Sequence, residues 1–446
     1  MKRSTLFCAW ALFALIATSF ADESSFSAFT DQEATDIVSS IISNTDGVKH
    51  PILFVPGLFG SQLEWKLDPT KTACNKTTKG TYEQCWIHVS DLLPGQDTCW
   101  VQNNVLGLSA DGITTPRDGV ETRVAFWPLV KSVEYLTDTR VVKNVAYYGH
   151  NLFKLLRAAG YEDNKTYLAH PYDFRASPLE YYQPGGVLDK FATLVEHLYA
   201  TNGNTPVDIV AHSMGCLVTT LSLGQQTQAW KDKYIHHAYL AGPPFGGAPK
   251  LAGAVINAPH EFPLVPPVYA SEATFIPALS TWCGGIWLAP DTGLLTKDTH
   301  LITHAGREYK LSDMGLFLNQ AAAAQPLIYQ CFKQTRGLFT ERCKHDCAPG
   351  VDTTILYGIS FQTQSSFKLT KGDFGDPLLD IQAEVESYVV GDQTVPVDSA
   401  TTLPKRWAAS GNHGHSVNFV AVENVKHQDL VRSKEGAEKL YESIFG

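Results

Sequence analysis

Beyond its first twenty residues the sequence has no long hydrophobic run. No later stretch approaches the roughly 18 consecutive apolar residues of a membrane-spanning helix, so we expect none. Positive charge is also scarce, because 35 Lys and Arg stand against 45 Asp and Glu, for a formal net charge of −10. Nucleic-acid binding requires a basic surface, and this balance argues against it. The sequence also has no Gly-rich phosphate loop, no zinc-like His/Cys spacing and no internal repeat, so we expect no metal and no cofactor.

The one hydrophobic run lies at the N-terminus. Lys2 and Arg3 precede apolar residues 6–16, and small residues follow as far as Ala21. This pattern predicts a signal peptide over residues 1–21, with a retained anchor as the alternative. Residues 22–49 form a polar lead-in, and residues 50–446 are long enough for one large domain with insertions.

Entry into the secretory pathway permits disulfides and glycosylation. The sequons at Asn75 and Asn164 are candidate glycosylation sites. We also expect two of the three cysteines Cys331, Cys343 and Cys347 to pair, although their spacing does not show which two. Such a chain works outside the cytosol, in a lysosome or the extracellular space.

A strand–turn–helix pattern lies near the middle of the chain. Residues 206–223 read PVDIVAHSMGCLVTTLSL, in which a β-branched run is followed by a sharp turn at Ser213. The positions two before and two after this serine are Ala211 and Gly215, which are small enough for the strained turn of a nucleophile elbow. The alternative is an ordinary serine that N-caps a helix.

An early strand followed by a tight loop could supply the oxyanion-binding groups of such a site. Residues 50–67 read HPILFVPGLFGSQLEWKL, where Gly57 and Gly60 follow a buried run. Hydrolases of the α/β class place an oxyanion-binding backbone N–H in this loop. Leu58 is the candidate here, and the amide of Met214 is the second donor. A plain turn explains the glycines equally well.

The late part of the chain supplies an acid and a base. Asp392 follows a strand predicted over residues 387–390, and His427 follows the last predicted strand, residues 417–422. The order Ser213, Asp392, His427 is that of an α/β-hydrolase triad, in which His accepts the serine proton and Asp orients the imidazole. Rival candidates are His212, His413, His415, Asp376, Asp380 and Asp398.

Two insertions are expected around this core. Residues 68–120 include a cysteine-bounded loop, 74–99, that carries Trp86, Leu92 and Leu93. These side chains suit a membrane interface, whereas the alternative is that they pack beneath the loop as a small core. Residues 248–350 lack regular strand–helix alternation and predict an α-rich cap with a lid segment.

Ordered motifs from residue 50 onward resemble the lecithin:cholesterol acyltransferase and lysosomal phospholipase A family, and its lysosomal branch more closely. They are HPILFVPGLFGSQLEWKLD, PYDFR at Pro171, VAHSMG at Val210, GPPFGG at Gly242 and GDQTVP at Gly391. The resemblance implies an α/β-hydrolase core, a cap, and a membrane-contact insertion closed by a Cys74–Cys99 disulfide. It maps nucleophile, acid and base onto Ser213, Asp392 and His427, and the oxyanion amides onto Leu58 and Met214.

Leu58 departs from the family pattern, which has Asp or Asn at that position. We therefore expect a monomeric serine phospholipase A and O-acyltransferase that works at a phospholipid membrane or lipoprotein surface. The acyl group would pass to water or to a lipid alcohol, a sterol or a ceramide. The alternatives are a triacylglycerol lipase or esterase with the same triad, and an inactive lipid-binding protein.

Overall fold

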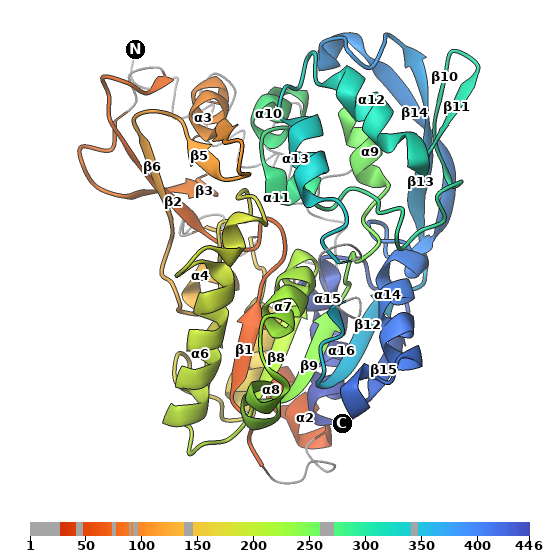
Figure 1. Ribbon diagram of the computed structural model, residues 1–446. Coiled ribbons are helices and arrows are strands. Elements are labelled where there is room, and N and C mark those ends of the chain that lie inside the picture. The colour runs from red at the N-terminus through yellow and green to blue at the C-terminus, as the bar shows by residue number, and fades with distance from the viewer. Residues whose placement is uncertain are drawn as a thin grey trace.

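Figure 1 shows the chain as a computed structural model. The structure describes residues 27–41, 48–73, 77–88, 91, 97–137, 146–258, 272–339 and 347–446. The predicted signal peptide therefore lies outside the described residues. Among the residues described, no helix combines the length and the apolar character needed to cross a bilayer.

A six-stranded sheet forms the centre of the molecule, and all of its strand pairs are parallel. Its spatial order is β15 (Val417–Val422), β12 (Asp352–Gly358), β9 (Ile235–Ala241), β8 (Val207–His212), β1 (Ile52–Val55) and β7 (Tyr167–Ala169). Every residue of β1 and β8 is buried, as expected for strands covered on both faces. Because the strands are parallel, all of them end at one side of the sheet, called here the carboxyl edge; the opposite side is the amino edge.

Two groups of helices pack against this sheet. One contains α6 (Val187–Thr201), α7 (Met214–Gly224) and α8 (Gln228–Tyr234), and the other α2 (Asp31–Ile41), α5 (His150–Ala158), α15 (Asp429–Arg432) and α16 (Lys434–Phe445). The buried residues of α6 recur at helical spacing, Leu188, Phe191, Val195 and Leu198, so one stripe faces the sheet.

A second layer lies over the carboxyl edge (Figure 1). It holds a four-stranded sheet in the order β11 (Arg307–Lys310), β10 (His300–His304), β13 (Phe361–Lys371) and β14 (Gln382–Gly391). Its helices are α9 (Lys250–Val255), α10 (Glu272–Leu279), α11 (Cys283–Ile286), α12 (Met314–Ala321) and α13 (Ile328–Thr335). We call the described residues of the ranges 248–258, 272–339 and 361–391 the cap. The cap has its own hydrophobic core, which includes Ile302, Phe317 and Phe367.

The cap corrects two sequence-based expectations. It is not only α-rich, since it contains a sheet, and it extends beyond residue 350 through the β13–β14 hairpin. The strand predicted at 387–390 exists as part of β14, but it belongs to the cap sheet and not to the central one. Alternating apolar residues show that a strand forms, and they do not show which sheet it joins.

A third layer stands beside the cap, at the upper left of Figure 1. It combines the antiparallel strands β3 (Glu83–Trp86), β2 (Leu63–Leu67) and β6 (Val120–Val124) with α3 (Asp97–Asn104) and the short pair β4 (Leu106–Leu108) and β5 (Thr114–Pro116). This is where the sequence predicts the insertion over residues 68–120. Helix α3 packs against α10 of the cap, so the two layers touch. In the part of the chain that the structure describes, the core also contains α4 (Lys131–Glu134) and α14 (Val397–Ala409).

Candidate active site

Ser213 occupies the turn between β8, which ends at His212, and α7, which begins at Met214. Its backbone has φ 54° and ψ −126°, a strained conformation for a residue other than glycine. Gly215 permits this close turn, because a Cβ there would lie 2.4 Å from the carbonyl oxygen of Val55. The Ser213 side chain caps no helix N–H, contrary to the N-cap alternative.

The structure brings the three predicted triad side chains together. Ser213 Oγ lies 2.8 Å from His427 Nε2, and His427 Nδ1 lies 2.7 Å from Asp392 Oδ2. All three residues are buried. The other carboxylate oxygen, Asp392 Oδ1, accepts hydrogen bonds from the amides of Thr394 at 3.0 Å and Val395 at 2.6 Å. These donors fix the carboxylate, which in turn orients the imidazole toward the serine.

The rival candidates do not join this group. Asp398 lies in the first turn of α14, and Asp376 and Asp380 lie in the hairpin loop of the cap. His415 lies near Asp232 and Asp352, at the amino edge.

The position of Asp392 depends on a long excursion of the chain. After β12 ends at Gly358, the chain passes through β13 and β14 in the cap and then returns at Gly391. A Cβ added at Gly358 would lie 2.6 Å from the Cβ of Asp392, so the acid sits beside the end of β12. The central sheet therefore positions all three side chains at its carboxyl edge, as in the crevice of an open α/β sheet.

Leu58 and Met214 also converge on Ser213. A Cβ added at Gly57 would lie 2.7 Å from the Cβ of Ser213, so the loop after β1 passes directly over the serine. Within the described part of the chain, the amide of neither Leu58 nor Met214 donates to a protein acceptor. Both N–H groups therefore remain available to an oxygen atom next to Ser213.

The sequence did not reveal a contact at this site between Tyr148 and His212, and it named His212 only as a rival base. The Tyr148 hydroxyl accepts a hydrogen bond from the Gly57 amide at 2.7 Å and lies 2.6 Å from His212 Nδ1. His212 Nε2 lies 2.9 Å from the carbonyl oxygen of His427. Burial, followed by the neighbouring His427, lowers the pKa of His212 to about 3, so its ring is neutral. Tyr148 lies in an aromatic, loop-rich stretch, and no motif distinguishes it.

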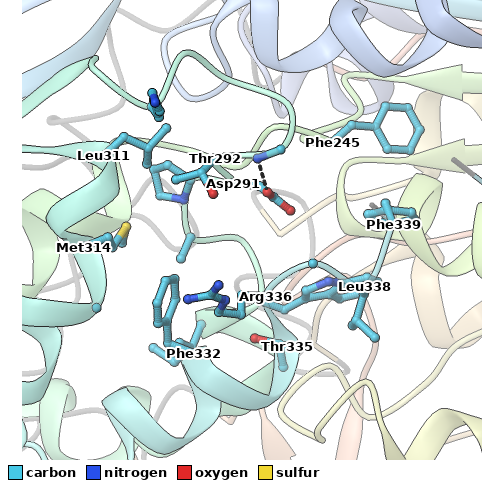
Figure 2. A pocket seen from close by; sticks show the side chains of 18 of the residues that line it. Phe245, Asp291, Thr292, Leu311, Met314, Phe332, Thr335, Arg336, Leu338 and Phe339 are labelled. Atoms are coloured by element: carbon cyan, nitrogen blue, oxygen red, sulfur yellow. Dashed lines mark hydrogen bonds between the residues drawn. The ribbon is translucent and has the colours of Figure 1, made fainter. Parts of the chain in front are cut away.

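A cavity of about 310 Å³ lies between the core and the cap (Figure 2). The core contributes Leu217, one helical turn after Ser213 in α7, and Phe245, from the loop after β9. The cap contributes apolar side chains from α11, α12 and α13 and from the segments beside them. They include Trp287, Met314, Phe332, Leu338 and Phe339. The lining also includes Asp291, whose Oδ1 accepts a hydrogen bond from the Gly293 amide, and Arg336.

Trp86 corrects the expectation for the membrane-contact residues. Its side chain is 7% exposed, its ring stacks on Phe59 at 5.0 Å, and Nε1 donates to the carbonyl oxygen of Phe59. It also packs against Trp100 and Trp282. The alternative, in which the ring packs beneath the insertion, therefore holds for Trp86. Sequence alone could not decide this, because Trp suits both settings. Leu92 and Leu93 lie outside the described residues.

The cysteines differ in part from expectation. Cys283 and Cys331 form a disulfide that joins α11 to α13, so Cys331 does not pair with Cys343 or Cys347. Cys347 and Cys99 are each disulfide-bonded. Cys74, the predicted partner of Cys99, lies outside the described residues, as does Cys343.

The predicted modification and metal sites remain expectations. Asn164 is exposed in the turn before β7, and its Oδ1 accepts a hydrogen bond from the Val130 amide. Asn75 lies outside the described residues. In the described ranges, no group of three or more His, Cys, Asp or Glu side chains is arranged to hold a metal ion.

The parallel sheet, the strained serine turn and the convergence of Ser213, His427 and Asp392 define an α/β-hydrolase fold. The model of the lecithin:cholesterol acyltransferase family matches residues 82–293 and 295–442. The chain therefore belongs to that family, and it is an enzyme of the acyltransferase and phospholipase type.

Curated relatives and a solved structure accompany this match. The phosphatidylcholine-sterol acyltransferase of Mus musculus is 29% identical over 401 residues, which cover 89% of this chain and 85% of the relative. The lysosomal phospholipase A and acyltransferase of Bos taurus is 30% identical over 358 residues, which cover 79% of this chain and 82% of the relative. A monoglyceride lipase structure from Saccharomyces cerevisiae superposes with a TM-score of 0.30 at 13% identity, over 66% of this chain and 77% of that one.

Proposed function

We propose that the protein is a serine-dependent phospholipase A and O-acyltransferase acting on glycerophospholipids. The observation that carries this proposal is the hydrogen-bonded series from Ser213 through His427 to Asp392 at a strained turn. Oγ of Ser213 attacks a fatty ester while His427 Nε2 takes its proton. The same proton then passes to the departing alkoxide, which leaves as a lysophospholipid, and an acyl-serine remains.

The second half of the reaction uses the same groups in reverse. Water or a lipid alcohol gives a proton to His427 as its oxygen attacks the acyl-serine, and the proton returns to Oγ of Ser213 as the bond breaks. The amides of Leu58 and Met214 stabilise the negative oxygen that forms in each half. Loss of one such donor typically raises the barrier by about 3 kcal/mol.

The cavity between α7 and the cap supports a lipid substrate. The apolar part of its lining begins at Leu217, one helical turn from Ser213, where the chain of an acyl-serine would need room. Polar side chains, among them Asp291, Lys297 and Arg336, line the remainder. We propose that this cavity takes the fatty acyl chain. The cap over the carboxyl edge would limit access of water and so favour transfer to a lipid alcohol such as a sterol or ceramide.

The setting proposed for this activity is a lipid surface. The relatives carry the names of a phosphatidylcholine-sterol acyltransferase and a lysosomal phospholipase A. A signal peptide would direct the chain to a lysosome or to the outside of the cell. There we propose that it works as a monomer on a phospholipid membrane or a lipoprotein. The insertion and the cap, which contact each other through α3 and α10, lie on the same side of the molecule as the site (Figure 1).

A product assay with matched variants tests the proposal. Phosphatidylcholine vesicles that contain a sterol and ceramide are incubated with the wild-type enzyme, with Ser213→Ala and with Ser222→Ala. Ser222 is a buried serine of the same helix whose hydroxyl bonds to the Val218 carbonyl. We expect lysophospholipid, fatty acid and acylated alcohol from the wild type and from Ser222→Ala, and none from Ser213→Ala. Turnover of a triolein emulsion but not of phosphatidylcholine would identify a neutral-lipid lipase. Absence of turnover on any ester would identify a lipid-binding protein. Either outcome overturns the proposal.

A further inference from the structure

The two loops that must cooperate in catalysis start from strands far apart in the sheet. The oxyanion loop, Gly57 and Leu58, follows β1, and His427 follows β15. Three strands, β8, β9 and β12, separate β1 from β15 in the spatial order. Hydrogen bonding within the sheet therefore connects these loops only through three intervening strands.

Tyr148 and His212 make a direct connection. The Tyr148 hydroxyl bonds to the Gly57 amide, and His212 bridges that hydroxyl and the backbone carbonyl of His427. His427 in turn donates its own backbone N–H to the carbonyl oxygen of Asp392 at 2.9 Å. The series of hydrogen bonds thus runs from the oxyanion loop to His427 and Asp392.

The chemistry of each group gives the series one direction. The Gly57 amide can only donate and the His427 carbonyl can only accept, so the Tyr148 oxygen accepts from Gly57 and donates its own proton to His212 Nδ1. The His212 proton is then on Nε2 and is donated to the His427 carbonyl. This arrangement requires a neutral His212 in one tautomer. The ring is 2% exposed, and its charged form is disfavoured there.

We infer that Tyr148 and His212 are positioning residues that hold the oxyanion loop and the catalytic histidine in register. Neither side chain contacts Ser213 Oγ through a hydrogen bond, and neither lines the cavity proposed for the acyl chain. They affect the positions of the oxyanion-binding amides and of His427 Nε2, and these positions matter most in the transition state. This inference rests on the proposed serine mechanism.

The experiment compares two adjacent tyrosines. Tyr148→Phe keeps the ring and removes the hydroxyl, which leaves the Gly57 amide and His212 Nδ1 without their partner. Tyr147→Phe is the matched control, because the Tyr147 ring packs against Tyr135 and His150 and makes none of these hydrogen bonds. We expect Tyr148→Phe to lower kcat on phosphatidylcholine vesicles and on p-nitrophenyl butyrate by about 10- to 100-fold, with KM nearly unchanged. Tyr147→Phe should leave both constants within about twofold of the wild type.

A double variant separates positioning from a merely structural role. If the two residues act as one unit, adding His212→Asn to Tyr148→Phe lowers kcat little further, whereas independent contributions would multiply. A Tyr148→Phe enzyme with wild-type kcat overturns the inference, even if its Tm falls. The proposed function itself fails in a different way, namely if the wild-type enzyme cleaves no ester and a fluorophosphonate does not label Ser213.

Discussion

Each edge of the central sheet carries a hydrogen bond between a histidine and an aspartate, in different surroundings. At the carboxyl edge, His427 Nδ1 lies 2.7 Å from Asp392; at the amino edge, His236 Nδ1 lies 2.8 Å from Asp208. The first imidazole presents its other nitrogen to Ser213, whereas the face of the second stacks on His50, with ring centroids 3.6 Å apart. A buried aspartate beside a histidine is therefore not a site by itself. The strained serine turn and the loop after β1 make the difference.

Burial differs between the edges as well. His427 and His212 are almost fully buried at the carboxyl edge, and His170, which follows β7, is completely buried there. The side chain of His236 is 43% exposed at the amino edge. The exclusion of water strengthens hydrogen bonds and charges at the edge where the reaction is proposed, and it requires the non-catalytic imidazoles there to be neutral.

The largest effect is expected from the same substitution in the two aspartates. Asp392→Asn replaces the carboxylate that orients His427, favours the wrong imidazole tautomer and should lower kcat by about 10⁴-fold. Asp208→Asn should leave kcat within about twofold, because that pair contacts no reacting atom. Steady-state rates on phosphatidylcholine vesicles measure both. Equal losses in the two variants would show that the edges do not differ in the way described.

A smaller effect should come from filling the cavity at the carboxyl edge. Gly315 lines the cavity, and a Cβ added there meets only ring atoms of Phe332 at 3.7 Å and Tyr329 at 3.9 Å. Gly315→Leu should therefore be tolerated and should lower kcat/KM for palmitoyl esters by about tenfold relative to butyryl esters. Gly285→Leu, at a glycine with open space around it, is the control. A chain-length profile unchanged by Gly315→Leu would place the acyl chain elsewhere.

Acid should lower the free energy of unfolding through two buried histidines at the carboxyl edge. Burial lowers the pKa of His170 and of His212 to about 3, from 6.5 in the unfolded chain. Below pH 6.5 the unfolded chain binds protons that the folded chain does not. Each ring therefore removes about 1.4 kcal/mol of unfolding free energy per pH unit down to about pH 3. We expect the highest Tm above pH 7 and a steady decrease from pH 6.5 to 4.5.

His170→Phe tests the source of that decrease. The ring lies between Tyr172 and Phe191, so an aromatic replacement suits the space. The variant should show a shallower fall in Tm between pH 6.5 and 4.5 than the wild type. An identical slope in the two proteins would mean that the acid sensitivity arises from other groups.

The parts predictable from sequence were those with strong local constraints. The serine turn was predicted from a strand, small residues around Ser213 and a helix. The acid and the base of the triad were predicted from the positions of Asp392 and His427 after late strands. The burial of Trp86 and the membership of β14 in the cap sheet depend on partners distant in the sequence. The same holds for the Cys283–Cys331 bond and for the contact of Tyr148 with His212. Periodicity and motifs report local structure, and they do not report which distant segments meet.

The central claim is that Ser213 becomes acylated by a glycerophospholipid. The direct measurement is mass spectrometry of the enzyme, quenched in acid within one turnover of mixing with dipalmitoyl phosphatidylcholine, followed by peptide mapping. We predict one palmitoyl group on the peptide that contains Ser213, formed in the wild-type and Asp208→Asn enzymes and absent from Ser213→Ala. Rapid lipid cleavage without an adduct on that peptide, or cleavage that persists in Ser213→Ala, would contradict the account.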